Sequence, residues 1–477
     1  MSPGSRRRLI GAFLLLLLLR HVLLAFACAP YGDDWGYAAM GIRSDPWERL
    51  VHEHHTWNGR YFSNALVLYG PLTLGIEPGL SLYRSVPVLL IILGTAAGAW
   101  LLAGLPGFVP RRVDRWMLAL AFTLLHLHAM PHLGEGLYWY TGAVTYQGAW
   151  VLVLAHAGAV LRLERAGRGW SRAVVAIVAL IAAVGSNETA MALLVLGHTA
   201  WVLHDIMHRR MPRAWQWSML AAAVGCGLVV ALAPGNAVRG MHFPQRHDLL
   251  LTLGMGGAQA LRFALVWVTD PGVLAALLLA WLFGRAGASP VRTVPGDRGP
   301  MPWLVAAAVA LCVGTVLPFW SMGMLGQHRT LNFVMGPFLI ALLGAAQALG
   351  HRTRGWRMPA WLLTSTTRRL AMGTGLAALL LWGNDRWVTH DLLSGEALRF
   401  RRHTTKLHRI LTFSARSESS PAEVPVFHEP LRSLRIPEPT ADPDAYWNRT
   451  LAGYFGGDDF RVVAIDPATA RPPQAPR

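Results

Sequence analysis

The sequence predicts an all-α integral membrane protein, a bundle of about ten or eleven transmembrane helices. Hydrophobic residues make up 53% of the 477 residues and charged residues only 14%, whereas soluble domains carry about a quarter charged residues. The apolar residues also lie in long blocks, and a helix needs about 20 of them to cross a bilayer. Composition and block length together argue against an ordinary soluble fold.

The first apolar block, residues 9–29, follows a run of arginines at 6–8. It is too long for the hydrophobic region of a signal peptide and lacks a clear cleavage site, so we expect an uncleaved first span. Arg20 and His21 interrupt it and are expected to face the bundle or to reach toward the membrane surface. The further apolar blocks are residues 86–105, 116–133, 145–161, 173–185, 189–203, 217–233, 258–283, 303–320, 331–349 and 370–387. The short pair around Asn187 fits two tilted helices or a re-entrant hairpin.

Basic residues recur in every second loop between these blocks. If the N-terminus is cytoplasmic, the same face receives the basic loops around Arg111, Arg162, Arg209, Arg285 and Arg352. The opposite loops hold most of the carboxylates, so the chain obeys the positive-inside rule loop by loop. This alternation predicts a multi-pass protein of the bacterial inner membrane.

The predicted organisation is a polytopic transmembrane domain over residues 1–388, with an exoplasmic first loop at 30–84, and an exoplasmic C-terminal tail over 389–477. The tail is expected to begin with an amphipathic helix as far as Phe413, and residues 461–465 have the pattern of a strand. A basic run at 399–409 argues against an exoplasmic tail. Charge in long tails, however, orients a chain weakly.

The net charge of +17 would indicate a nucleic-acid partner if it were not placed in short loops, where it meets anionic membrane lipid instead. No nucleic-acid partner is therefore expected.

Cys28, Cys226 and Cys312 lie in or beside apolar blocks and form no CxxC motif, so neither a disulfide framework nor a zinc site is predicted. The segment His52-Glu53-His54-His55 matches no standard ligand spacing, and no metal site or cofactor is predicted there.

The strongest candidate for chemistry is the pair Asp33 and Asp34, which follows the first span directly. Adjacent carboxylates repel each other, which favours protonation of one of them or capture of a cation, so a divalent metal is an alternative occupant of the pair. Trp35 and the neighbouring tyrosines suit the membrane interface and also suit stacking on a sugar. The structural alternative is a helix N-cap followed by an aromatic belt.

Other candidate residues fall on the same side of the membrane by this topology. Arg60 and Arg239 suit a phosphate or a carboxylate, and Glu188 is a carboxylate near the membrane plane, where burial of charge is costly. The remaining candidates for substrate binding are Glu135, Tyr138, Trp139, Asn236 and Arg329. Polar groups on one side fit an enzyme that acts at one leaflet, whereas alternating access needs groups near the midplane.

The segments Asp33-Asp34-Trp35, Asn58-Gly59-Arg60, Tyr138–Gly142, Ser186-Asn187-Glu188 and Ala233–Arg239 occur in an order that resembles a bacterial polytopic family known mostly as a domain of unknown function. That family is similar to the GT-C glycosyltransferases, including the prophage glucosyltransferases that decorate O-antigen. The resemblance covers most of the chain, including residues 446–454 of the tail. It departs from the better-studied members in lacking a clear large C-terminal domain.

The resemblance implies a GT-C-like bundle that transfers a sugar from a polyprenyl-phosphate donor to an envelope glycan or lipid acceptor. An acidic residue of the first exoplasmic loop, here Asp33 or Asp34, would act as general base. Arg60, Arg239 and Arg329 would hold the donor phosphate, and Trp35, Tyr138 and Trp139 would stack on the sugar or the prenyl chain. The alternatives are a transporter or flippase for a lipid-linked glycan and a non-catalytic assembly subunit.

Overall fold

The computed structural model describes residues 2–105, 111–166, 169–287, 299–326, 328–427, 431–434, 439–457 and 459–465. Helices account for 78% of the protein. Within the described ranges the sheet structure is one parallel pair, β1 (Ala422–Pro425) with β2 (Val462–Ile465). The predicted all-α architecture is confirmed, and so is the strand predicted at 461–465.

Eight helical stretches are long and apolar enough to cross a membrane. They lie in or contain the helices α1 (Pro3–Ala25), α5 (Ile76–Gly104), α8 (Gly148–Ala166), α10 (Glu188–Met207), α11 (Ala214–Ala231), α13 (Leu249–Val268), α15 (Met301–Met322) and α16 (His328–Arg352). Two apolar helices are shorter, α9 (Trp170–Val184) and α14 (Pro271–Arg285). Large apolar side chains such as Leu15, Ile92 and Leu261 are exposed on the outside of the bundle, as a lipid-facing surface requires.

Two further helices of the bundle, α6 (Arg112–Ala129) and α17 (Ser365–Leu381), are shorter or less apolar than these eight. They cover a large part of the apolar blocks at 116–133 and 370–387. Asn187 separates α9 from α10, and its side chain caps α10 by accepting a hydrogen bond from the amide of Ala190 at 2.8 Å. The short pair thus forms two separate helices.

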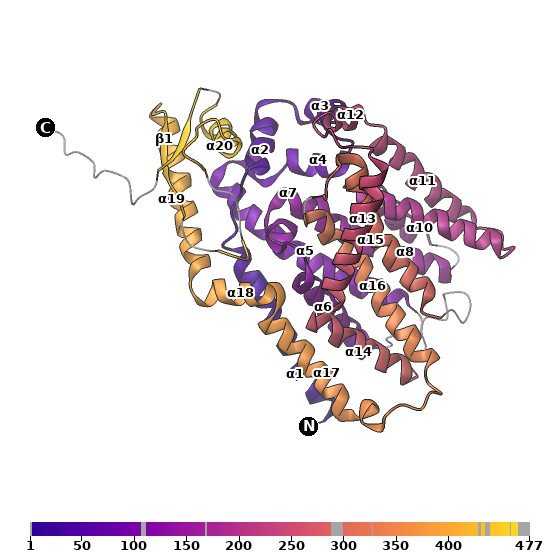
Figure 1. Cartoon of the computed structure of the whole chain (residues 1–477). Helices are drawn as coiled ribbons and strands as arrows, with labels where there is room; N and C mark the ends of the chain where they lie inside the picture. Colours follow the sequence, from indigo (N-terminus) through magenta and orange to yellow (C-terminus); the bar gives the residue numbers. More distant parts are fainter. Residues whose placement is uncertain are drawn as a thin grey trace.

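One end of the bundle carries short helices that connect the long ones (Figure 1). They are α2 (Asp33–Arg43), α3 (Pro46–Thr56), α4 (Tyr61–Leu68), the 3₁₀ turn η1 (Pro71–Leu74), the π-helical turns η2 (Gly134–Tyr138) and η3 (Ala143–Gln147), α7 (Tyr140–Gly142) and α12 (Pro234–Gly240). The N-terminus lies at the opposite end. We call the end with the short helices the capped end.

The C-terminal part of the chain returns to the capped end. It follows α17, which the 3₁₀ turn η4 (Ala360–Leu363) precedes, and comprises α18 (Gly383–Leu393), α19 (Glu396–Arg416), β1, α20 (Tyr446–Phe455) and β2. The amphipathic helix predicted as far as Phe413 is present as α19. Residues of α2, α19, α20 and both strands share one apolar cluster that includes Trp35, Leu411 and Val462. The described part of the tail is thus folded against the first loop (Figure 1).

A buried ionic cluster joins α1, α6 and α18, and we call it the Asp385 cluster. The Asp385 carboxylate is fully buried and lies 2.9 Å from Arg20 Nη2, 3.1 Å from His21 Nε2 and 2.9 Å from His128 Nδ1. His128 Nε2 in turn lies 3.3 Å from an oxygen of Asp270, which caps α14. Arg20 and His21 therefore face the bundle, which is one of the two expected arrangements. The charge of Arg20 is tolerated in an apolar segment because it is paired with Asp385.

Candidate functional site

The helix α2 begins at a glycine that no other residue replaces easily. Gly32 has a φ of +52°, and a Cβ there would lie 1.8 Å from the ring of Trp447 in α20. The turn brings Asp33 and Asp34 into the first turn of α2, where the helix dipole favours negative charge. The tight contact with Trp447 fixes the tail directly over this turn.

Asp34 is almost completely buried, and both of its carboxylate oxygens accept hydrogen bonds. Its Oδ1 accepts from the hydroxyl of Thr141 at 2.6 Å and from the amide of Thr141 at 3.0 Å. Its Oδ2 accepts from the hydroxyl of Tyr83 at 2.8 Å and from the amide of Tyr31 at 3.3 Å. Burial raises the pKa of Asp34 to about 7, although these hydrogen bonds act in the opposite direction. The residue ties α2 to α5 and α7.

Asp33 has a different environment from that of its neighbour. It is half-buried, and its carboxylate accepts a hydrogen bond from the hydroxyl of Tyr446 in α20. Burial, and then the negative charge of Asp33, raise the pKa of Tyr446 well above its ordinary value. Of the two adjacent carboxylates, Asp33 is the one with access to solvent and to a ligand.

Trp139 and Arg329 form a stacked arrangement beside this pair. The guanidinium of Arg329 lies over the Trp139 ring at 4.5 Å from its centroid, and Tyr31 stacks on the same indole at 5.0 Å. Burial raises the pKa of Tyr31, as do the negative charges of Glu135, Asp34 and Asp33, while Arg329 opposes them. The three carboxylates and Arg329 therefore all lie close enough to the Tyr31 hydroxyl to affect its pKa.

The segment that carries Glu135 and Trp139 is not a regular α-helix. It consists of η2, α7 and η3, so two π-helical turns flank a single α-helical turn, and such turns are frequent at functional sites. A Cβ at Gly136 would lie 2.3 Å from Asn332, so only glycine permits this close approach to α16. The Trp139 Nε1–H is buried and has no hydrogen-bond partner among the described residues.

The residues Arg60, Glu188 and Arg239 form a second charged group at the capped end, which we call the Glu188 triad. Arg60 donates to Glu188 Oε2 through Nε at 2.8 Å and approaches it with Nη2 at 2.7 Å. Arg239 reaches Glu188 Oε1 at 3.3 Å. Burial would lower the pKa of Arg60, but the Glu188 carboxylate outweighs it and raises that pKa. The three side chains remain 19–29% exposed and carry a formal charge of +1.

Two glycines, Gly59 and Gly235, permit the close backbone packing that assembles this triad. A Cβ at Gly235 would lie 2.4 Å from the amide nitrogen of Trp57, so α12 packs directly on the end of α3. Asn58 Oδ1 accepts a hydrogen bond from the Arg60 amide at 2.9 Å and thereby fixes the turn before α4. The motifs that contain Gly59 and Gly235 are thus explained by close packing as much as by chemistry.

Some of the predicted site residues lie apart from these groups. Trp35 is 2% exposed in the cluster between α2, α19 and α20, and its Nε1–H donates to the carbonyl of Pro30. Tyr138 is also buried, and its hydroxyl meets His21 of the Asp385 cluster. Asn236 donates to the carbonyls of Val230 and Ala231 and so ends α11. For these three residues the structure supplies a packing or capping role.

Glu135 is half-buried at the start of η2 and has no side-chain hydrogen bond or ion pair among the described residues. It contrasts with Glu53 of α3, which pairs with Arg49 at 2.7 Å. The histidines beside Glu53 form no group of three close ligand atoms in the part of the chain that the structure describes. Glu135 is therefore available to a ligand, and the α3 histidines are not arranged as a metal site.

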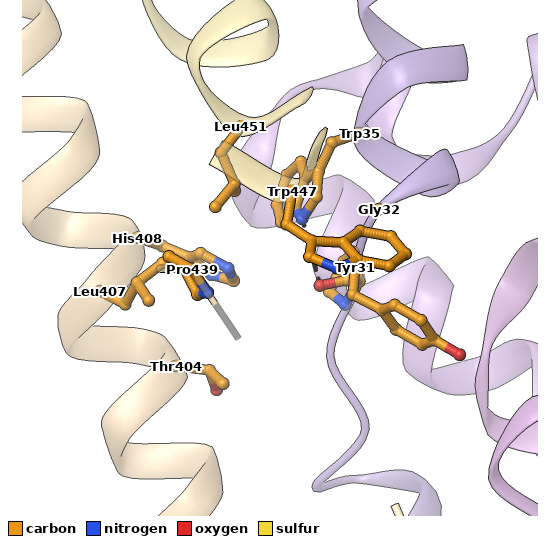
Figure 2. A pocket seen from close by; sticks show the side chains of 10 residues that line it. Tyr31, Gly32, Trp35, Thr404, Leu407, His408, Pro439, Trp447 and Leu451 are labelled. Atoms are coloured by element: carbon orange, nitrogen blue, oxygen red, sulfur yellow. Dashed lines mark hydrogen bonds between the residues drawn. The ribbon is translucent and has the colours of Figure 1, made fainter. Parts of the chain in front are cut away.

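A small cavity lies where the tail meets the first loop (Figure 2). Its lining comes from Tyr31 and Trp35 on one side, Trp447 of α20 above, and Thr404 and His408 of α19 on the other. Its volume of about 30 Å³ accommodates water but not a sugar. It belongs to the packing between tail and loop.

Sequence reasoning missed the part of the site that comes from the tail. Tyr446, which contacts Asp33, lies 413 residues away from it in the sequence. The only available signal was the cluster of aromatic residues at 446–454 in an otherwise polar tail. Thr141 lies within the Tyr138–Gly142 motif, but nothing in the local sequence marks it as a partner of Asp34. Tyr83 lies inside α5 and belongs to none of the motifs.

No protein-family model, curated protein or solved structure matches this chain.

Proposed function

We propose that this chain is a glycosyltransferase of the bacterial inner membrane, with the capped end on the exoplasmic side. It would move a sugar from a polyprenyl-phosphate donor to an envelope glycan or lipid. The observation that carries the proposal is the gathering of a half-buried carboxylate, Asp33, and a guanidinium, Arg329, around Tyr31 and Tyr446. An acid–base group and an anion-binding group at one end of an apolar bundle suit a reaction between a lipid-borne phosphate and a hydroxyl.

In the proposed reaction the acceptor hydroxyl oxygen forms a bond to the anomeric carbon of the sugar. The bond between that carbon and the phosphate oxygen breaks, and the polyprenyl phosphate leaves with the bonding electron pair. Asp33 takes the proton of the acceptor hydroxyl as general base. The pKa of Asp34, about 7, also suits proton transfer. Its buried and fully hydrogen-bonded oxygens, however, favour a positioning role, because a base must first reach its proton.

Arg329 and the two arginines of the Glu188 triad support the binding of a phosphate. Arg329 has no ion pair among the described residues, and its contact with the Trp139 ring holds it in place. The Glu188 triad carries one positive charge in excess and is open to solvent on one side. A guanidinium binds phosphate oxygens in a bidentate manner, and its attraction grows as negative charge develops on the leaving phosphate.

A second candidate function, transport of a lipid-linked glycan, is favoured by one observation. The Asp385 cluster places several ionisable side chains inside the bundle, and such groups often mark ion or substrate pathways. A transporter would move the glycan without breaking the bond between sugar and phosphate. The two functions therefore differ in one product, free polyprenyl phosphate.

The test uses mass spectrometry of envelope glycans from cells with and without the gene, followed by the purified protein in vesicles that contain a polyprenyl-phosphate sugar. We expect the gene to add one sugar to an envelope glycan or lipid, and the purified protein to release polyprenyl phosphate when that acceptor is supplied. Movement of an intact donor across the vesicle with no release of polyprenyl phosphate would overturn the proposal in favour of transport.

A further inference from the structure

A second polar group lies outside the proposed catalytic site, at the junction between α18 and α19. His390, Asp391 and Glu396 each contribute one ligand atom, and these three atoms lie within 4.8 Å of one another. Asp391 is completely buried, Glu396 is 8% exposed, and His390 is open to solvent on one side. Two carboxylates in a nearly closed space carry negative charge that needs compensation.

The orientation of Asp391 directs one oxygen toward His390. Its Oδ2 accepts hydrogen bonds from the amides of Arg432 and Ser433, at 3.2 Å and 2.8 Å, and from the Ser433 hydroxyl. Its Oδ1 faces His390 Nδ1 at 3.3 Å. Hydrogen bonds of this kind to the second oxygen are what fixes a metal-ligating carboxylate.

Glu396 supplies an independent observation. Its Oε2 is buried and has no hydrogen-bond partner among the described residues, and it points toward His390 Nδ1 at 3.7 Å. A buried carboxylate oxygen without a donor is costly, so an occupant is expected at this position. In a tetrahedral zinc site the ligand atoms are about 3.4 Å apart, given metal–ligand distances of about 2.1 Å. The distances of 3.3 Å and 3.7 Å from His390 are close to that value.

We propose that His390, Asp391 and Glu396 bind a divalent transition-metal ion, with Zn²⁺ as the best fit. A neutral imidazole and two carboxylates carry a formal charge of −2, which the ion balances. Mixed nitrogen and oxygen ligands favour Zn²⁺ over Ca²⁺, which prefers oxygen alone. Three protein ligands leave the fourth position to water on the exposed side of His390.

The ion would join the tail to the bundle. Asp391 holds the backbone of Ser433, and a Cβ on Gly134 would lie 3.2 Å from the Ser433 carbonyl. Gly134 immediately precedes Glu135 in η2. The metal therefore supports the segment that carries Glu135 and Trp139. This inference stands on its own residues and does not depend on the proposed glycosyl transfer.

The test measures metal binding directly. Untagged protein is purified, stripped with a chelator, and titrated with Zn²⁺, Mn²⁺ or Ca²⁺ in a calorimeter, while bound metal is counted by mass spectrometry. We expect one Zn²⁺ per chain, and His390→Gln and Glu396→Gln should each weaken its binding by at least about tenfold. His54→Gln is the matched control, since it removes a histidine from the α3 cluster, and should bind as the wild type does.

His390→Gln is the decisive variant because His390 is half-exposed and its loss leaves the hydrogen bonds to Asp391 Oδ2 in place. The chelator should lower the melting temperature of the wild type and of His54→Gln but not that of His390→Gln. Failure of the wild type to bind stoichiometric metal would overturn the proposal and leave His390 as a hydrogen-bond partner of Asp391 only. Equal Zn²⁺ affinity in His390→Gln, or a preference for Ca²⁺, would also overturn it.

Discussion

The Asp385 cluster and the Glu188 triad are built from similar charged groups but lie in opposite environments. Asp385 is fully buried and satisfied by Arg20, His21 and His128, which belong to other helices. The members of the Glu188 triad remain 19–29% exposed and have an excess of positive charge. A closed and balanced cluster holds helices together, whereas an open and unbalanced one can attract an anion. Similar charged groups thus hold helices together in the Asp385 cluster, and in the Glu188 triad they form the anion-binding group that we propose.

The largest expected effect breaks the closed cluster. Asp385→Asn removes the negative partner of Arg20 and two histidines, and loss of one member of a buried ion pair costs about 3–5 kcal/mol. We expect the variant to unfold at a much lower temperature or denaturant concentration in detergent. Glu188→Gln is the matched comparison and should cost clearly less, because Arg60 and Arg239 keep about a fifth of their side-chain surface exposed and solvent partly compensates for the lost charge. Equal destabilisation by both changes would remove the distinction between the two clusters.

The sequence predicts much of the architecture because apolar blocks are a local property. Most of the long apolar helices overlap blocks of the sequence, and the positions of Asp33, Glu135, Glu188 and Arg239 at the ends of apolar blocks indicated a common side. The block predicted at 258–283 was wrong as a single span, because Asp270 caps a new helix and divides it between α13 and α14. The pairing of Arg20 with Asp385 was not predictable, since 365 residues separate them and nothing local specifies the partner. The burial of Trp35 was also missed, because an interfacial tryptophan and one covered by a tail have the same local sequence.

A smaller effect concerns the pH dependence of stability. Asp34 has a pKa of about 7 in the folded protein, against about 3.9 for an unfolded aspartate. Between these values the folded protein binds more protons than the unfolded chain, so this group lowers the free energy of unfolding as the pH rises from about 4 to about 7. Above that range its contribution is constant.

Asp34→Asn should remove this slope, since an amide does not titrate. The measurement is the difference in melting temperature between wild type and variant from pH 5 to pH 8, with Asp33→Asn as the matched neighbour. We expect the difference to change with pH for Asp34→Asn only. A wild-type slope retained in Asp34→Asn would show that another group is responsible.

The smallest expected effect concerns the open triad. Arg239→Lys keeps the charge but replaces a planar fork of donors with a point charge, so donor binding should weaken by about tenfold. The turnover number at saturating donor should change less than KM does. Arg209 lies just beyond the opposite end of α10 from Glu188, so Arg209→Lys is the control for replacing an arginine away from the triad. Wild-type KM in Arg239→Lys would mean that Arg239 serves only to pair with Glu188.

We propose above all that Asp33 acts as the general base and does not merely have a structural role at the start of α2. The most direct measurement compares sugar transfer by purified wild type and Asp33→Asn at equal monodispersity. Asparagine keeps the volume of aspartate, accepts a hydrogen bond from Tyr446 and caps a helix about as well, but it cannot take a proton. The account predicts a loss of about 10²–10⁴-fold in rate with the melting temperature preserved. Transfer at a near-wild-type rate by Asp33→Asn would contradict it.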